Sequence, residues 1–154
     1  MYKRQVLLHG ITSSGKTEVY IHLIQSALRE GGQVLYLLPE IALTTQMVKR
    51  LQIIFGGHIS VYHSRYTDQE RTEIWHGVRE GKCDFILGTR SAIFLPFSHL
   101  RLIIVDEEHD ASYKQFDAMP RYHARDAALA LARQHRAKVL LGCLLYTSPS
   151  PRDA

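Results

Sequence analysis

Residues 5–17 read QVLLHGITSSGKT, and this stretch decides the fold. The apolar run at residues 5–9 indicates a strand, and the eight residues from Gly10 to Thr17 match the pattern G-x-x-x-x-G-K-[ST]. In that pattern the loop joins a strand to a helix, whose positive end and exposed N–H groups bind phosphate. We therefore predict a phosphate-binding loop. The flanking strand and helix disfavour the alternative, a glycine-rich turn with an exposed lysine.

Each residue type in this loop meets a need of a bound nucleotide. Backbone N–H groups can surround a β-phosphate, the ammonium group of Lys16 can reach the β- and γ-oxygens, and the hydroxyl of Thr17 can ligate Mg²⁺. The predicted cofactors are accordingly ATP and Mg²⁺. The residues expected to bind the nucleotide are Gly10, Ser13, Ser14, Gly15, Lys16 and Thr17.

A second motif follows another strand. Residues 102–105 form a continuous apolar run, and Asp106-Glu107-Glu108-His109 comes directly after it. Open α/β sheets bind ligands at the carboxyl ends of their strands, so these side chains are expected opposite the loop. We predict that Asp106 holds Mg²⁺ through water and that Glu107 polarises the water that attacks the γ-phosphate. His109 is also counted among the nucleotide-binding residues, and we expect it to hydrogen-bond between the nucleotide and DNA sites rather than bind metal. The alternative is a solvated acidic turn.

The rest of the chain repeats the alternation of strand and helix. Further strands are expected at residues 34–38, 59–62, 84–87 and 138–141, and helices around residues 19–28, 43–55 and 121–136. Continuous apolar strands joined by helices predict a parallel sheet with helices on both faces. The expected fold class is therefore α/β.

Composition sets weaker limits. The 154 residues are 45% hydrophobic, which is enough for one compact core. Lys and Arg outnumber Asp and Glu by 19 to 15, a balance that suits a phosphate-rich partner but also an ordinary protein. Cys83 and Cys143 have no C-x-x-C spacing, which indicates neither a zinc site nor a disulfide framework. No apolar run reaches the length of a membrane span, so we expect a cytoplasmic protein with no membrane partner.

Two further blocks complete the set of motifs. Residues 37–46 read LLPEIALTTQ, and residues 88–94 read GTRSAIF. Together with the phosphate-binding loop and the acidic motif, they resemble motifs I, Ia, Ib and II of the superfamily 2 helicases, in the same order. Residues 112–115, SYKQ, and residues 121–126, RYHARD, are similar to the PriA family of primosomal replication-restart helicases. The resemblance covers residues 5–142.

The resemblance implies that residues 1–142 form part of a RecA-like P-loop NTPase lobe, the first motor lobe of an ATP-dependent 3′-to-5′ DNA helicase. It also implies partners: forked and single-stranded DNA without sequence specificity, primosome proteins and single-strand-binding proteins. The family usually has Gly where Ser13 stands here. Its second lobe with an arginine finger and its zinc module are not in this chain, so zinc is expected only there. The chain alone is expected neither to hydrolyse ATP usefully nor to unwind DNA. The family expects Ser-Ala-Thr after Gly142, and we interpret residues 143–154 as a non-native or disordered tail.

Several residues near the strand ends are predicted to contact DNA. Thr44, Thr89 and Arg90 offer hydroxyl groups and a cation to the DNA backbone. The alternatives are a helix cap for Thr44 and an internal salt bridge for the second block. The loop after the acidic motif mixes aromatic rings with cations, which suits stacking on unpaired bases, although these rings could instead fill a local core. Its predicted DNA-binding residues are Tyr113, Lys114, Phe116, Arg121 and Tyr122.

Three other functions share part of this pattern. Another superfamily 2 DNA translocase, such as a restriction-enzyme motor, would have the same motor motifs. A P-loop small-molecule kinase would share the loop but would not need the acidic motif with its continuation to His109. A non-catalytic DNA-binding module would have no need for both Lys16 and Glu107.

Overall fold

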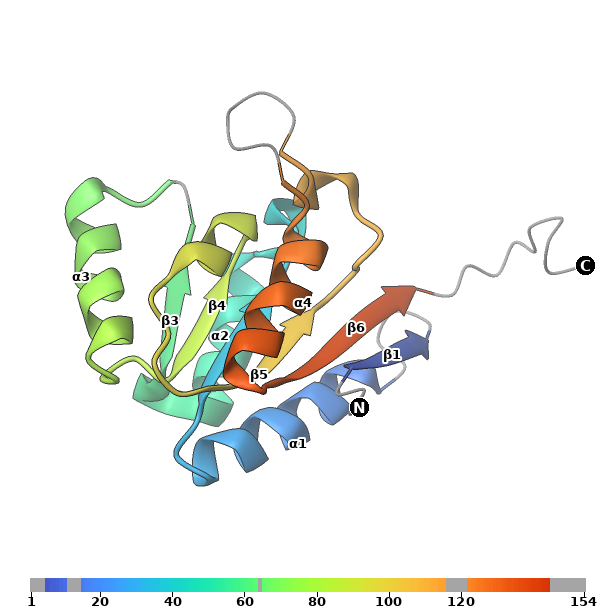
Figure 1. Ribbon diagram of the computed structural model, residues 1–154, viewed down its shortest axis with the longest axis horizontal. Helices are drawn as coiled ribbons and strands as arrows, with labels where there is room; N and C mark the ends of the chain where they lie inside the picture. Colours follow the sequence, from blue (N-terminus) through green and yellow to red (C-terminus); the bar gives the residue numbers. More distant parts are fainter. Residues whose placement is uncertain (1–4, 11–14, 64, 116–121, 145–154) are drawn as a thin grey trace, which may run out of the picture.

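The computed structural model describes residues 5–10, 15–63, 65–115 and 122–144. In this part of the chain, six parallel strands form one sheet in the order β1-β6-β5-β2-β4-β3 (Figure 1). The strands are β1 (Gln5–Gly10), β2 (Gln33–Leu37), β3 (Ile59–Tyr62), β4 (Phe85–Gly88), β5 (Leu100–Val105) and β6 (Lys138–Leu144). The predicted α/β fold with a parallel sheet is confirmed.

Helices follow most of the strands. The α-helices are α1 (Lys16–Arg29), α2 (Thr45–Phe55), α3 (Asp68–Arg79) and α4 (Ala124–His135). Short 3₁₀ helices are η1 (Glu40–Ala42), η2 (Gly56–His58), η3 (Arg90–Phe94) and η4 (Ala111–Tyr113). The helices lie on both faces of the sheet, with α4 on one side and α1 and α2 on the other (Figure 1).

Strand β2 shows how one strand supplies both cores. Successive side chains of a strand point to opposite faces. Val34 and Tyr36 belong to the core under α1 and α2, whereas Leu35 and Leu37 belong to the core under α4 and η3. All four are fully buried, which is why the run lacks the polar alternation of a half-exposed strand.

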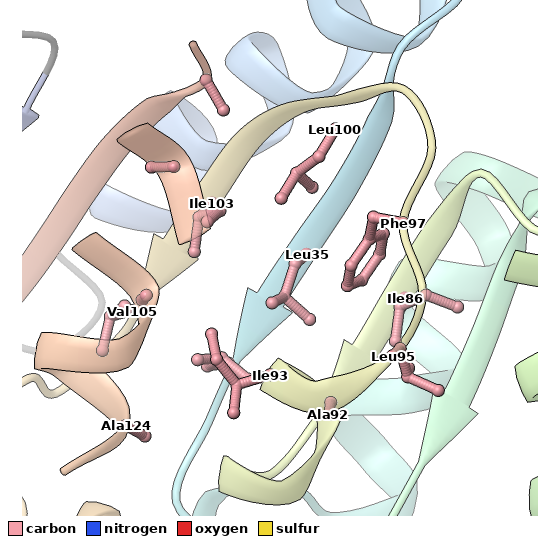
Figure 2. Packing of buried hydrophobic residues seen from close by; sticks show 14 of the residues in the cluster. Leu35, Ile86, Ala92, Ile93, Leu95, Phe97, Leu100, Ile103, Val105 and Ala124 are labelled. Atoms are coloured by element: carbon pink, nitrogen blue, oxygen red, sulfur yellow. The ribbon is translucent and has the colours of Figure 1, made fainter. Parts of the chain in front are cut away.

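The core under α4 is shown in Figure 2. Leu35, Ile86 and Ile103 come from adjacent strands, and Ile93 and Phe97 from η3 and the segment after it close the cluster beside them. Helix α4 contributes alanines at four-residue spacing, all buried: Ala124, Ala128 and Ala132. Because these side chains are small, the helix can lie close to the strands. This packing fixes the distance between α4 and the carboxyl end of β5.

One helix and the expected domain boundary differ from the sequence prediction. Helix α3 was not predicted, because it buries only Gly77 and Val78 in the core and has no broad apolar stripe. A capping box at its start, with Thr67 and Glu70 bonded reciprocally, was the available signal. Strand β6 runs to Leu144, two residues beyond the domain boundary expected at 142, while residues 145–154 of the expected tail lie outside the described residues.

Candidate nucleotide-binding site

The phosphate-binding motif lies where its pattern requires. Strand β1 ends at Gly10 and α1 begins at Lys16, so the motif joins a strand to a helix N-terminus. Gly15 has φ 96°, in the left-handed region that favours glycine, and it caps the helix. Lys16 is only 8% exposed, and Thr17 is partly buried. Ser13 and Ser14 lie outside the described residues.

Asp106 occupies the end of β5. Its backbone N–H donates to the carbonyl of Leu37 at 3.0 Å, which holds the ends of β5 and β2 together. Its carboxylate oxygen Oδ1 accepts hydrogen bonds from the hydroxyl of Tyr20 at 2.9 Å and from the N–H of Glu107 at 3.0 Å. Its Oδ2 lies 3.4 Å from the hydroxyl of Tyr36. Asp106 is thus a fixed carboxylate at the carboxyl edge of the sheet.

Glu107 lies beside it in an unusual backbone conformation. Its φ of 50° is in the left-handed region, which is uncommon for a residue other than glycine. Partial burial, followed by the negative charges of Asp106 and Asp110, raises the pKa of the Glu107 carboxyl group. The positive charges of His109 and Lys16 act in the opposite direction. Lys16 comes from a distant part of the chain, and its charge is the smallest of these influences on the Glu107 carboxyl group.

The acidic motif is also attached to β6 and α4. The N–H of Glu108 donates to the carbonyl of Gly142 at 2.8 Å. The carboxylate of Glu108 pairs with the guanidinium of Arg125 at 3.1 Å, at the start of α4. His109 itself is exposed. The expectation that His109 hydrogen-bonds between the nucleotide and DNA sites remains a prediction.

Tyr113 does not have the role predicted from sequence. Its ring is fully buried, and its hydroxyl donates to the carbonyls of Leu37, at 3.1 Å, and Asp106. A ring enclosed in this way cannot stack on a DNA base, so the predicted base contact is wrong for Tyr113. The structure supports the alternative, that the Tyr113 ring fills a local core. The tyrosine instead ties the end of β2 to the end of β5.

Three of the other predicted DNA contacts lie in the segments that follow β2 and β4. Thr44 is exposed and accepts a hydrogen bond from Met47 N–H at 3.2 Å, so it caps α2 as the alternative expected. Thr89 is only 5% exposed, and this burial argues against its predicted contact with DNA. Arg90 donates to the carbonyls of Ser112 at 3.0 Å and Lys114 at 3.3 Å. Within the described residues it does not form the salt bridge that was the alternative.

Arg90 also connects to the aromatic residues beyond the loop. The ring of Tyr122 is partly buried and packs edge-on against Phe94, with 4.8 Å between ring centroids. Burial raises the pKa of the Tyr122 hydroxyl, and the neighbouring charge of Arg90 opposes that rise. Lys114 is exposed beside them. Phe116 and Arg121 lie outside the described residues, and the DNA contacts of this group stay predictions.

Magnesium fits the side chains that meet here. Mg²⁺ prefers oxygen ligands, retains several waters and usually binds through one or two protein carboxylates together with phosphate oxygens. The hydroxyl of Thr17, in the first turn of α1, and the carboxylate of Asp106, directly after β5, can supply such oxygens.

Among the described helices, none combines the length and the apolar character that a membrane span requires.

Four residues of this site were not found by sequence reasoning: Tyr20, Tyr36, Arg125 and Gly142. Tyr20 lies four residues after Lys16, so the two share one face of α1, and that spacing was a usable signal. The other contacts depend on which strands are neighbours, and no local pattern states that.

The chain matches known helicase families. The family model described as DEAD/DEAH box helicase matches residues 1–143. The replication restart protein PriA of Haemophilus influenzae is 51% identical over 136 residues, which are 88% of this chain and 18% of that protein. PriA of Bacillus subtilis is 46% identical over 144 residues, which are 94% of this chain and 18% of that protein. The chain thus spans about a fifth of the length of the curated relatives it matches.

Solved structures agree on the fold. RecG bound to a three-way DNA junction superposes with a TM-score of 0.68 at 26% identity, over 95% of this chain and 18% of that one. The helicase domain of Pyrococcus furiosus Hef gives a TM-score of 0.62 at 20% identity, over 96% of this chain and 31% of that one.

Proposed function

The chain belongs to the DEAD/DEAH box helicase family, and from that premise we propose that it is the ATP-binding motor lobe of a replication-restart DNA helicase. The similarity to PriA proteins from two distant bacteria supports the replication-restart part of the proposal. Because the chain covers 18% of those proteins, unwinding itself belongs to a longer protein that contains this lobe.

One observation carries the proposal: Lys16 begins α1, and Tyr20, one turn later on the same helix, donates a hydrogen bond to Asp106, which follows β5. Glu107 directly follows Asp106, and partial burial, followed by the negative charges of Asp106 and Asp110, raises the pKa of its carboxyl group. A cation for phosphate and a carboxylate of raised pKa beside a fixed second carboxylate are the groups that ATP hydrolysis needs.

The proposed mechanism follows from these positions. Lys16 binds the β- and γ-phosphate oxygens, and the N–H groups around it hold the phosphates at the helix N-terminus. Thr17 and Asp106 would hold magnesium, which would neutralise charge on the phosphate oxygens when bound. Glu107 accepts a hydrogen bond from the attacking water, which bonds to the γ-phosphorus as the bond to the bridging β-γ oxygen breaks.

The DNA side of the proposal rests on the residues around Arg90. Arg90, Lys114 and Tyr122 lie together beyond the ends of β4 and β5 and combine cations with an aromatic ring. Such a group binds unpaired DNA without sequence preference and in a salt-dependent way. The exposed hydroxyl of Thr44 accepts from Met47 N–H but can still donate its own proton, and we propose it as a further contact with the DNA backbone. Forked DNA, primosome proteins and single-strand-binding proteins are the partners we propose for the longer protein.

Two alternatives are less well supported. Another superfamily 2 translocase would have the same site, but the curated matches reported above are replication restart proteins. A P-loop small-molecule kinase would explain Lys16 but not the match to a helicase family over residues 1–143.

DNA-stimulated ATP hydrolysis by the longer protein tests the proposal. We expect forked DNA to stimulate turnover more than plain duplex, and Lys16→Ala to abolish turnover on both. Lys49→Ala removes an exposed lysine from α2 and is the matched control. Normal turnover in the Lys16→Ala protein would overturn the nucleotide site. Equal stimulation by forked and plain DNA would favour a translocase of another class.

A further inference from the structure

Two buried tyrosines hold the Asp106 carboxylate. Tyr20 is 1% exposed and Tyr36 is 0% exposed, and their rings meet edge to face with centroids 5.6 Å apart. The hydroxyl of Tyr20 donates to Oδ1 of Asp106 at 2.9 Å, and that of Tyr36 lies 3.4 Å from Oδ2. Because core packing fixes both rings, both hydroxyl groups are fixed relative to the same carboxylate.

The two carboxylate oxygens are not equally occupied. An ionised carboxylate has about four lone-pair directions, two on each oxygen. Within the described residues, Oδ1 accepts from Tyr20 and from the N–H of Glu107, at 2.9 and 3.0 Å. Oδ2 has the longer contact with Tyr36. Oδ2 is therefore the oxygen with the greater remaining capacity to accept a hydrogen bond from a metal-bound water.

The tyrosines also connect this carboxylate to the phosphate-binding helix. Tyr20 lies one turn after Lys16 on α1, whereas Tyr36 belongs to β2 and Asp106 follows β5. The bond from Tyr20 thus fixes the position of the carboxylate relative to the helix that begins at the loop. Rotation of Asp106 away from that helix would break this bond.

Gly142 of β6 makes room for the contact. A Cβ atom at this position would lie 1.8 Å from the hydroxyl oxygen of Tyr20 and 2.8 Å from Oδ1 of Asp106. Both distances are far below van der Waals contact, so any larger residue would displace the tyrosine or the carboxylate. Glycine at 142 is therefore part of the same arrangement.

Phenol donors suit a carboxylate that must keep its charge. Lys or Arg in the same place would neutralise Asp106 and weaken its attraction for a cation, whereas a neutral hydroxyl orients it. A tyrosine hydroxyl is protonated at neutral pH, so the hydroxyl of Tyr36 is available as a donor.

We propose that Tyr20 and Tyr36 are positioning residues that hold the Asp106 carboxylate for magnesium, with Oδ1 occupied and Oδ2 left to metal-bound water. Tyr20 makes the shorter bond and has the larger effect. This inference rests on the proposed function, because it requires magnesium and ATP to bind at this site.

The effect of magnesium on ATP affinity tests the inference. Tyr20→Phe and Tyr36→Phe each remove one oxygen atom and keep the buried ring. ATP binding to the 154-residue chain is measured by calorimetry with Mg²⁺ and with EDTA, and the ratio of the two affinities gives the gain from the metal. We expect Tyr20→Phe to reduce this gain by about tenfold, and Tyr36→Phe by less, with the affinity in EDTA unchanged.

Controls separate positioning from stability. Tyr66→Phe removes a partly buried hydroxyl beyond β3, at the far edge of the sheet, and should leave the magnesium gain unchanged. A lower melting temperature of Tyr20→Phe with an intact magnesium gain would overturn the positioning role. If Tyr20→Phe does not fold, Tyr36→Phe decides by the same criterion.

Lys16→Ala distinguishes failure of this inference from failure of the proposed function. If the unaltered chain binds no ATP, or if Lys16→Ala binds ATP as well as the unaltered chain, the nucleotide site itself is wrong. If Lys16→Ala loses ATP binding while both tyrosine variants keep the full magnesium gain, only the positioning role is wrong.

Discussion

Replacing Gln33 by Met should destabilise the fold markedly, because the Gln33 side chain makes four buried or partly buried hydrogen bonds. Its Nε2 donates to the carbonyls of Val78 at 2.9 Å and Cys83 at 3.0 Å. Its Oε1 accepts from the N–H groups of Ser98 and His99, both at 2.9 Å. Met keeps the length of the side chain and removes all four bonds without leaving a large cavity.

The position of Gln33 explains why these bonds matter to the site. The residue is 2% exposed and lies where the pairing of β2 with β5 shifts register, between Gln33 and Val34. The side chain bridges the segment before β5 and the segment that follows α3. It therefore stabilises the register that brings Leu37 beside Val105 at the other end of these strands.

The magnitude follows from the count of bonds. Each intramolecular hydrogen bond contributes about 1 kcal/mol net, which gives about 4 kcal/mol for four bonds. Ser98 and His99 are exposed residues, so water can satisfy part of their loss, and we expect about 3 kcal/mol. With a urea dependence of about 2 kcal/mol per molar for a chain of this size, the unfolding midpoint should fall by about 1.5 M.

Urea unfolding of the 154-residue chain, followed by circular dichroism, measures this change. Gln25→Met makes the same substitution at an exposed position of α1 and should change the free energy of unfolding by less than about 0.5 kcal/mol. If Gln33→Met and Gln25→Met unfold at the same urea concentration, the four bonds do not stabilise the register as argued.

Three further predictions concern the nucleotide site in the longer protein. Glu107→Gln should leave ATP affinity near normal and lower turnover by about 100-fold or more, and an equal loss of both would indicate a structural role. The pKa of Glu107 is raised, and only its charged form polarises water. Turnover should therefore fall as the pH drops through that pKa, at a higher pH than for an ordinary Glu. A fall in turnover only at the pH of an ordinary Glu would contradict this. Gly15→Ala, at φ 96°, should cost about 1–2 kcal/mol of stability and weaken ATP binding, which thermal melting and calorimetry would show.

Local patterns in the sequence predicted most of the fold. The apolar runs at residues 34–38 and 102–105 correspond to β2 and β5, because a strand buried on both faces needs a continuous apolar run. The loop from Gly10 to Thr17 was placed between a strand and a helix, and β1 and α1 confirm that placement. Helix α3 was missed because few of its residues are buried.

The contacts within the site were harder to predict. Composition indicated that aromatic residues follow the acidic motif, but it could not tell which ring points inward, and Tyr113 is buried. The bonds from Tyr20 and Tyr36 to Asp106 require that β5 lie between β6 and β2. Strand order depends on packing between segments far apart in the chain, so the sequence pattern carries no direct sign of it.

Hydrogen exchange of the 154-residue chain with and without Mg·ATP tests the central claim most directly, because it locates the bound nucleotide without requiring turnover. We expect slower exchange at the backbone amides of residues 15–17 and of Asp106 and Glu107 together, since both segments would face one nucleotide. We expect no such change in Lys16→Ala. Protection confined to another surface would contradict a nucleotide site at the carboxyl ends of the strands. One such surface is the hollow lined by His99, Arg101 and Arg136, near the start of β5.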